Sequence, residues 1–242
     1  MALFQLAFSR GMGELHVANL ANQPFSTMKY ILFAVSSLLL VSACSNLRSS
    51  SSEKWVDLFN GENLDDFELK NGQHAYRLED GVIVGTTVAE EPNGFLCTKK
   101  QYSNFILEFE VLVDSLLNSG VQFRSHSTAE YRDFRVHGYQ VEIDAIPPIQ
   151  SGAIYDEARR ATWLANLDEN PEAQAAWRNG DWNHYRVEAN GSMLRTWING
   201  VPAVAVEDAL DASGFIGLQV HQTDHPVPLN VRWRNLRIME LD

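Results

Sequence analysis

The sequence predicts an all-β fold, an antiparallel sandwich or barrel, for the stretch from Trp55 to Asp242. Three observations support this prediction. Short segments that alternate apolar and polar residues recur along this stretch, turn residues separate them, and only two short segments have helical character. The chain has 242 residues, 45% of them hydrophobic, which is enough to bury one sizeable core.

The first clear strand is NFILEFEV, which starts at residue 104. Successive side chains of a strand point to opposite faces, so Phe105, Leu107, Phe109 and Val111 share one face. This face is expected to lie in the core.

Residues 184–204 predict consecutive hairpins. Asn-Gly pairs at 190–191 and 199–200 separate alternating runs, and this pair is the strongest short signal for a hairpin. Two further strands, GFIGLQVH and LNVRWRNLRIMEL, follow at 214–221 and 229–241.

The two helical stretches are DEARRATWL at 156–164 and NPEAQAAWRNG at 170–180. In the second, Asn170 is a suitable N-cap and Pro171 suits the first helical position. We therefore expect one or two short helices.

Three strand segments, SGVQFRSH, HGYQVEID and IGLQVHQ, combine an apolar face with an unusual polar one. The polar positions are Gln122, Arg124 and His126 in the first, Gln140, Glu142 and Asp144 in the second, and Gln219 and His221 in the third. A sheet face turned to water is the simple explanation for each strand alone. Water-facing strands are usually rich in Lys, Glu and Thr, however, whereas these strands carry Gln, Arg, His, Glu and Asp and almost no Lys. Amide, carboxylate and guanidinium groups suit sugar hydroxyls. The pattern favours a shared binding face.

The charge balance argues against a nucleic-acid partner. The net charge is −12, the isoelectric point is about 5.0, and the chain has no basic run. No nucleotide cofactor is expected either.

Residues 28–43 predict a signal peptide. Lys29 follows a methionine, and an apolar run at 30–41 is too short to span a bilayer but has the length of a signal-peptide core. The letters VSAC, which end at Cys44, resemble a bacterial lipobox. The resemblance implies a lipid on Cys44 and a membrane-anchored protein of the cell envelope.

The segments beside the signal peptide have different expected uses. Residues 1–27 are expected to be an upstream extension from a misassigned start, with a genuine extension of unknown use as the alternative. Residues 44–54 predict a flexible tether. Ser45 fits sorting to the outer membrane, facing the periplasm. Cys97 is then left as a small buried residue.

Six sequence blocks resemble one known family. They are NSGVQFRSH, HGYQVEID, SGAIYDEARR, GDWNHYRVEANGSMLRTWINGVPA, GFIGLQVHQ and WRNLRI. In this order, between Trp55 and Leu241, they look like a 3-keto-glycoside lyase/hydratase domain, also called 3-keto-disaccharide hydrolase. The resemblance implies a concanavalin A-like jelly roll of two antiparallel sheets over residues 55–242, with the site on a concave sheet. It also implies an oxidised, 3-keto sugar as substrate.

The chemistry of such a substrate follows from its ketone. A ketone at C3 acidifies the hydrogen on C2, so a base can remove it and form an enolate. Expulsion of the C1 substituent then gives a 2-hydroxyglucal, and addition of water completes a net hydrolysis. The site needs a base, an enolate stabiliser and an acid for the leaving group.

The polar strands contain candidates for each role. Glu142 or His221 is the candidate base, and Arg124 is the candidate enolate stabiliser. Asp144 or His126 is the candidate that assists the leaving group. A divalent metal ion that polarises the ketone stays open, with Glu142, Asp144 and His221 as candidate ligands, although their spacing is not compact.

Other residues are assigned to substrate binding or to structure. The expected substrate-binding residues are Gln122, His126, Gln140, Tyr155, Asp156 and Gln219. Tyr155 and Asp156 are expected in a loop that follows the polar strand. Arg159 and Arg160 are expected to pair with Asp156 and Glu157.

The strand-like segments also contain Trp182, Trp197 and Trp233, for which we expect core packing rather than sugar stacking. His184 is expected to be structural.

Two other functions remain open. A non-catalytic carbohydrate-binding module uses the same fold. A conventional glycosidase could use Glu142 and Asp144, whose Cα atoms would lie roughly 6.6 Å apart on a strand. Activity on an unoxidised disaccharide would identify the glycosidase.

Overall fold

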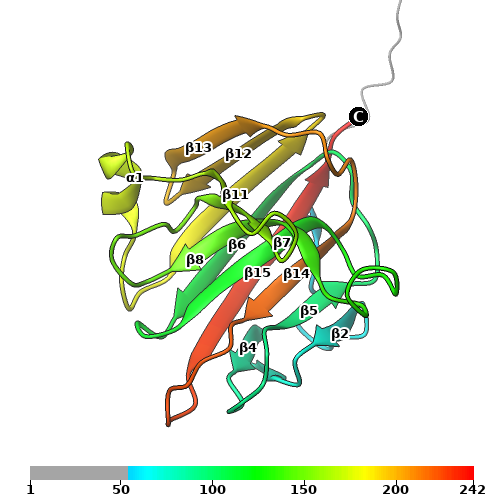
Figure 1. Cartoon of the computed structure of the whole chain (residues 1–242), viewed down its shortest axis with the longest axis vertical. Helices are drawn as coiled ribbons and strands as arrows, with labels where there is room; N and C mark the ends of the chain where they lie inside the picture. The colour runs from blue at the N-terminus through cyan, green and yellow to red at the C-terminus, as the bar shows by residue number, and fades with distance from the viewer. Residues whose placement is uncertain (1–53) are drawn as a thin grey trace, which may run out of the picture. The chain divides into compact units, whose positions relative to one another are not determined.

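The computed structural model describes residues 54–242, which form a pair of antiparallel sheets packed face to face (Figure 1). The prediction of an all-β jelly-roll sandwich is therefore confirmed. The predicted extension at 1–27, the signal peptide at 28–43, Cys44 and most of the tether lie outside the described residues and stay predictions.

One sheet, which we call the back sheet, has the strand order β13-β12-β11-β6-β15-β4-β3, with β1 paired to β15. Its strands are β1 (Val56–Asp57), β3 (Ala75–Glu79), β4 (Val82–Thr86), β6 (Phe105–Val113), β11 (Asn183–Asn190), β12 (Met193–Ile198), β13 (Val201–Glu207) and β15 (Asn230–Glu240). The predicted hairpins are confirmed, because β11 pairs with β12 and β12 with β13.

The other sheet, which we call the front sheet, has the order β10-β9-β8-β7-β14-β5-β2. Its strands are β2 (Phe67–Asn71), β5 (Gly94–Thr98), β7 (Asn118–His126), β8 (His137–Asp144), β9 (Ile154–Glu157), β10 (Trp163–Ala165) and β14 (Phe215–Val220). The polar segments SGVQFRSH, HGYQVEID and IGLQVHQ thus correspond to β7, β8 and β14. They are neighbours in this sheet, in the order β8-β7-β14.

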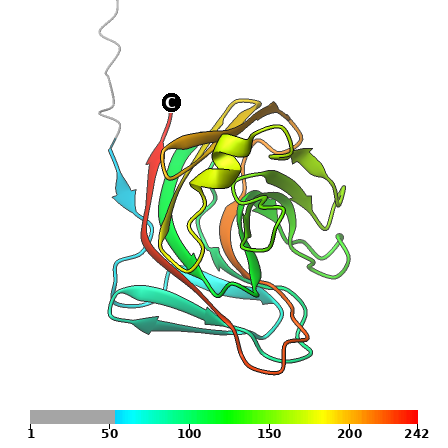
Figure 2. The ribbon, with the colours of Figure 1, turned by 90° about the vertical axis from the view of Figure 1, so that its left-hand side faces the viewer.

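A helix, α1 (Pro171–Ala176), lies against β12 and β13, as Figure 2 shows from the side. Asn170 caps it, because its side chain accepts a hydrogen bond from the backbone N–H of Ala173, as the sequence predicts. Among the described residues, no helix is long and apolar enough to cross a bilayer.

The prediction of a helix at 156–164 is wrong. Asp156 and Glu157 end β9, a turn follows, and Trp163 begins β10. Tyr155 and Asp156 therefore lie in a strand and not in the expected loop. The reason is tertiary: β9 pairs with β8, and β10 extends the sheet beyond it.

The core lies between the sheets and fixes the orientation of β8. Tyr139, Val141 and Ile143 are fully buried among the core residues. The buried Tyr185 of the back sheet donates a hydrogen bond to the backbone carbonyl of Glu142 at 3.2 Å. Because the core holds one face of β8, Gln140 and Glu142 must point to the opposite face.

The three tryptophans that were expected in the core divide between the core and the outer surface of the back sheet. Trp233 is fully buried, as expected, and so is Cys97. Core packing is wrong for Trp182 and Trp197, which are partly exposed and lie under the guanidinium groups of Arg234 and Arg186. This arrangement is a cation–π contact.

Candidate active site

A cleft of about 530 Å³ opens over β8, β9 and β10 on the face of the front sheet that points away from the core. It is lined by Asn93, Asn118, Arg135, Gln140, Glu142, Tyr155, Glu157, Trp163, His221 and Gln222. Of the residues predicted from the sequence, the structure brings Gln140, Glu142, Tyr155 and His221 together here.

A chain of hydrogen bonds, which we call the amide relay, forms the floor beside the cleft. Ser125 donates its hydroxyl to the side-chain oxygen of Gln122 at 2.7 Å. The Gln122 amide donates to that of Gln140 at 2.7 Å, and Gln140 donates to Glu142 Oε2 at 3.1 Å. From the other side, Asn118 donates to Glu142 Oε1 at 2.5 Å. The relay thus ends at a carboxylate that only accepts.

Gly120 is needed beside the relay. It faces Glu142 across the β7–β8 pair, and a Cβ at this position would lie 2.4 Å from the side-chain carbonyl carbon of Gln140. A larger residue would displace Gln140 from Glu142.

Burial raises the pKa of Glu142 to about 7. The hydrogen bonds from Asn118 and Gln140 act in the opposite direction, and the charges of Asp144 and Glu157 add to the increase. A carboxyl group with such a pKa can gain or lose a proton near neutral pH, which suits a general base or acid.

Glu157 is the second carboxyl group in the cleft. Burial raises its pKa, which the charge of Arg135 partly offsets. Its Oε1 lies 3.9 Å from Arg135 Nη2 and 3.5 Å from Asn93 Nδ2. Burial also raises the pKa of Asp144, but this side chain accepts from the backbone N–H of Ile146 and does not line the cleft.

His221 follows β14 at the edge of the cleft. Its Nδ1 lies 2.7 Å from the carbonyl oxygen of Gln222. Because a carbonyl can only accept, Nδ1 carries the proton, which leaves Nε2 as the acceptor of the neutral ring.

Gln122 and Gln219 are fully buried in the floor and do not line the cleft. The side-chain amide of Gln219 has no hydrogen-bond partner among residues 54–242.

The aromatic side of the cleft is formed by Tyr155 and Trp163. Their rings pack edge to face, with centroids 5.1 Å apart and planes at 68°. Tyr155 is partly buried, and Trp163 on β10 is 38% exposed.

Arg124 does not lie in the cleft. The expectation that it shares a polar face with Gln122 and His126 by regular alternation along β7 is therefore wrong. The strand has a bulge here: its pairing with β8 shifts between Phe123 and His126, and Arg124 has φ +46°. Its buried guanidinium donates to the carbonyl oxygens of Ser103 and Gly191 and to the side chain of Asn104. We therefore assign it a structural position and no role in the chemistry of the cleft.

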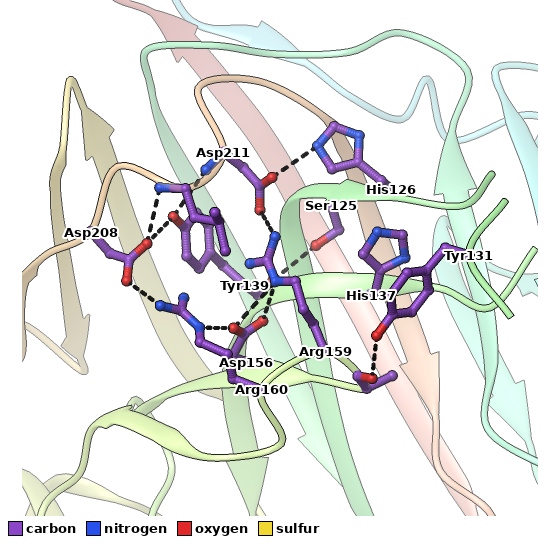
Figure 3. A network of polar contacts seen from close by, with 12 residues as sticks. Ser125, His126, Tyr131, His137, Tyr139, Asp156, Arg159, Arg160, Asp208 and Asp211 are labelled. Carbon is purple, nitrogen blue, oxygen red and sulfur yellow. Dashed lines mark hydrogen bonds and ion pairs between the residues drawn. The ribbon is translucent and has the colours of Figure 1, made fainter.

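His126 and Asp156 belong to a separate charged network outside the cleft (Figure 3). The fully buried Asp156 accepts from Arg159 and Arg160, as the sequence predicts. The two arginines also reach Asp211 and Asp208, each at 2.6 Å.

The same network includes His126, whose Nε2 lies 3.3 Å from Asp211, and Tyr139, which donates its hydroxyl to Asp208 at 2.5 Å. The network joins the turn after β9 to the loop before β14. Glu157 faces the cleft instead of pairing with Arg159 or Arg160. His184 is 42% exposed and lies 3.8 Å from Glu108.

Sequence reasoning missed six residues of the cleft: Asn93, Asn118, Arg135, Glu157, Trp163 and Gln222. Asn118 continues the alternation of Gln122, and Glu157 and Trp163 would have been found had residues 154–165 been interpreted as strands. The other three come from connecting segments, which have no periodic signal.

The candidate metal ligands do not converge. Among residues 54–242, no group of three or more His, Cys, Asp or Glu side chains is arranged to hold a metal ion.

Comparison with known proteins supports a carbohydrate-related assignment. Residues 54–239 match the model of the family described as the 3-keto-alpha-glucoside-1,2-lyase-like domain. No curated protein matches the sequence.

Solved structures share the fold at low sequence identity. One is a proposed glycosyl hydrolase of Parabacteroides distasonis, at 20% identity and TM-score 0.58, covering 78% of this chain and 95% of that one. Another is the carbohydrate-binding module CBM66 of Bacillus subtilis, at 16% identity and TM-score 0.54, covering 72% and 96%. A third, a Bacillus subtilis protein of unknown function with a galectin-like fold, has 11% identity and TM-score 0.57, covering 77% and 94%. At these identities the likeness supports the fold.

Replacing Arg124 tests its structural position. Arg124→Met removes a buried guanidinium and the hydrogen bonds that it donates to carbonyl groups of two loops, so we expect the free energy of unfolding to fall by about 3 kcal/mol or more. Arg132→Met, at an exposed arginine of the β7–β8 loop, is the control and should stay within about 0.5 kcal/mol of the wild type. Urea denaturation measures both. An Arg124→Met protein of unchanged stability would contradict the assignment.

Proposed function

The chain belongs to the 3-keto-alpha-glucoside-1,2-lyase-like domain family, and from this premise we propose that it cleaves 3-keto-glycosides in the cleft of the front sheet. The observation that carries the proposal is the environment of Glu142. Its carboxyl group lies in the cleft, is oriented from two sides by amides, and has a pKa of about 7.

In the proposed first step, the Glu142 carboxylate removes the proton on C2 of the keto sugar. The electron pair of the C2–H bond moves toward the C3 carbonyl and forms the enolate. Arg135, a guanidinium that lines the cleft, stabilises the negative charge on the C3 oxygen. Arg135 thus has the role of enolate stabiliser, for which the alternation of polar residues in the sequence suggested Arg124.

In the second step, the enolate restores the ketone and forms a C1–C2 double bond as the C1–O bond breaks. The electron pair leaves with the glycosidic oxygen, which receives a proton from His221, protonated at Nε2, or from solvent. The product is a 2-hydroxy enone. Addition of water, hydroxyl at C1 and proton at C2, gives the free 3-keto sugar.

The first experiment separates this proposal from its two alternatives. The purified protein is incubated with a 3-keto-disaccharide and with the unoxidised parent, each with and without chelator. We expect release of the free sugar and an ultraviolet absorbance of the enone from the keto sugar alone, with no effect of chelator. Cleavage of the unoxidised parent would instead indicate a conventional glycosidase. Binding of both sugars without cleavage would indicate a carbohydrate-binding module.

The pH dependence tests the role of Glu142. A base must be ionised, so kcat/KM should rise with pH and level off above an apparent pKa of about 7. Glu142→Gln should lower kcat by roughly 10² to 10⁴ and remove this rise. Glu110→Gln, on the outer surface of the back sheet, is the matched control and should keep the wild-type profile. A rate that falls as the pH rises through 7 would make Glu142 the acid.

We also propose that the enzyme is anchored to the outer membrane, facing the periplasm, through a lipid on Cys44. The lipobox-like VSAC supports this proposal. In cells fed a labelled fatty acid, the wild type should be labelled and recovered with membranes, and Cys44→Ser should be neither. Cys97→Ser should behave as the wild type, and a labelled Cys44→Ser would refute the anchor.

A further inference from the structure

The floor of the cleft changes in character along one cross-strand row. The backbone register places Gln122 of β7 opposite Gln140 of β8, Gln140 opposite Tyr155 of β9, and Tyr155 opposite Trp163 of β10. Amides therefore occupy β7 and β8, and aromatic rings occupy β9 and β10. All but Gln122 line the cleft.

Trp163 differs from the other outward-facing tryptophans. Trp55, Trp182 and Trp197 each lie under an arginine guanidinium. Among the described residues no such cation covers the ring of Trp163, whose ring contact is the edge-to-face one with Tyr155. A partly exposed indole, supported from one side and lining a polar cleft, offers a flat apolar surface to a ligand.

The distance of this pair from Glu142 is suited to a second ring of the substrate. Glu142 and Gln140 are on β8, and Trp163 lies two strands away, roughly 10 Å at the usual strand spacing. A keto ring with its C2 at Glu142 occupies the space over β8. A substituent on C1 that points along the cross-strand row then lies over β9 and β10.

We propose that Tyr155 and Trp163 form a leaving-group subsite that binds an uncharged sugar ring. This inference rests on the proposed function, because it takes Glu142 as the group that meets C2.

The charges around the subsite exclude acidic sugars. Glu157 follows Tyr155 by two residues on the same face of β9, and its nearest cation, Arg135, already lies 3.9 Å from it. Glu142 is the other carboxyl group of the cleft. A uronic acid on the aromatic pair would add a further negative charge without an added partner, and like charges disfavour binding.

The test compares leaving groups on one 3-keto-glucosyl unit: methanol, glucose and glucuronic acid. We expect Trp163→Ala to lower kcat/KM about tenfold for the glucose conjugate, by loss of ring stacking, and to leave the methyl glycoside within about twofold. Trp163→Phe should retain most of the activity on the glucose conjugate. Trp182→Ala, at a tryptophan that immediately precedes β11 of the back sheet, is the matched control and should change neither rate.

Several results would overturn the subsite. An equal loss of kcat/KM on the methyl and glucose conjugates in Trp163→Ala would mean that Trp163 contacts the keto ring or supports the fold. No loss on either conjugate would mean that Trp163 does not bind the substrate. Cleavage of the glucuronic acid conjugate as fast as the glucose conjugate would refute the preference for a neutral ring.

A binding measurement separates failure of the subsite from failure of the proposed function. If the wild type cleaves none of the three conjugates, the proposed function fails. Titration calorimetry with glucose and an unoxidised glucose disaccharide then tests whether the aromatic pair binds a second sugar ring. The disaccharide should bind more tightly than glucose, and Trp163→Ala should abolish this difference. Retention of the difference in Trp163→Ala, or its absence in the wild type, would refute the subsite.

Discussion

The candidate site depends on the directed hydrogen bonds that run from Ser125 through Gln122 and Gln140 to Glu142. Each glutamine amide in this relay accepts through its oxygen from the residue before it and donates through its nitrogen to the residue after it. The last member must offer an acceptor to the amide of Gln140, and the Glu142 carboxylate does so. A buried relay that ended at a donor would leave polar groups unpaired away from water, at considerable cost. The position of Glu142 and the direction of the hydrogen bonds in the floor therefore depend on each other.

The relay begins at Ser125 because β7 leaves regular alternation one residue earlier. The bulge at Arg124 turns the Ser125 hydroxyl toward Gln122, and Gly138 on the neighbouring strand leaves room for it, since a Cβ there would lie 2.7 Å from Ser125 Oγ. The same bulge directs Arg124 to the carbonyl groups of two loops. One local irregularity thus supplies both the start of the relay and an anchor for the loops around the sandwich.

The sequence predicted the portions of this site that follow uninterrupted strands. Gln140 and Glu142 share a face of β8 with no irregularity between them, and the period of two is enough to place them. It failed at Arg124, because a bulge has no reliable periodic signal. It also failed at 156–164, where the composition favours a helix but Arg159 and Arg160 are held by Asp211 and Asp208, some fifty residues later. Arg135 could not be predicted either, since it reaches the cleft from a connecting loop.

The displacement of Arg124 also has a consequence for the chemistry. Had β7 continued its alternation, a guanidinium would lie on the same face as Glu142, and an opposite charge nearby lowers the pKa of a carboxyl group. The cleft-lining cation Arg135 instead pairs loosely with Glu157, and Glu142 is held by the neutral amides of Asn118 and Gln140. Neutral donors orient the carboxylate without fully offsetting the cost of burying its charge, so its pKa stays at about 7. A base of this strength removes a proton from carbon more readily than an ordinary carboxylate does, and it is still ionised in a large fraction of molecules at neutral pH. The bulge that takes Arg124 out of the cleft is therefore one condition for Glu142 to act as a base.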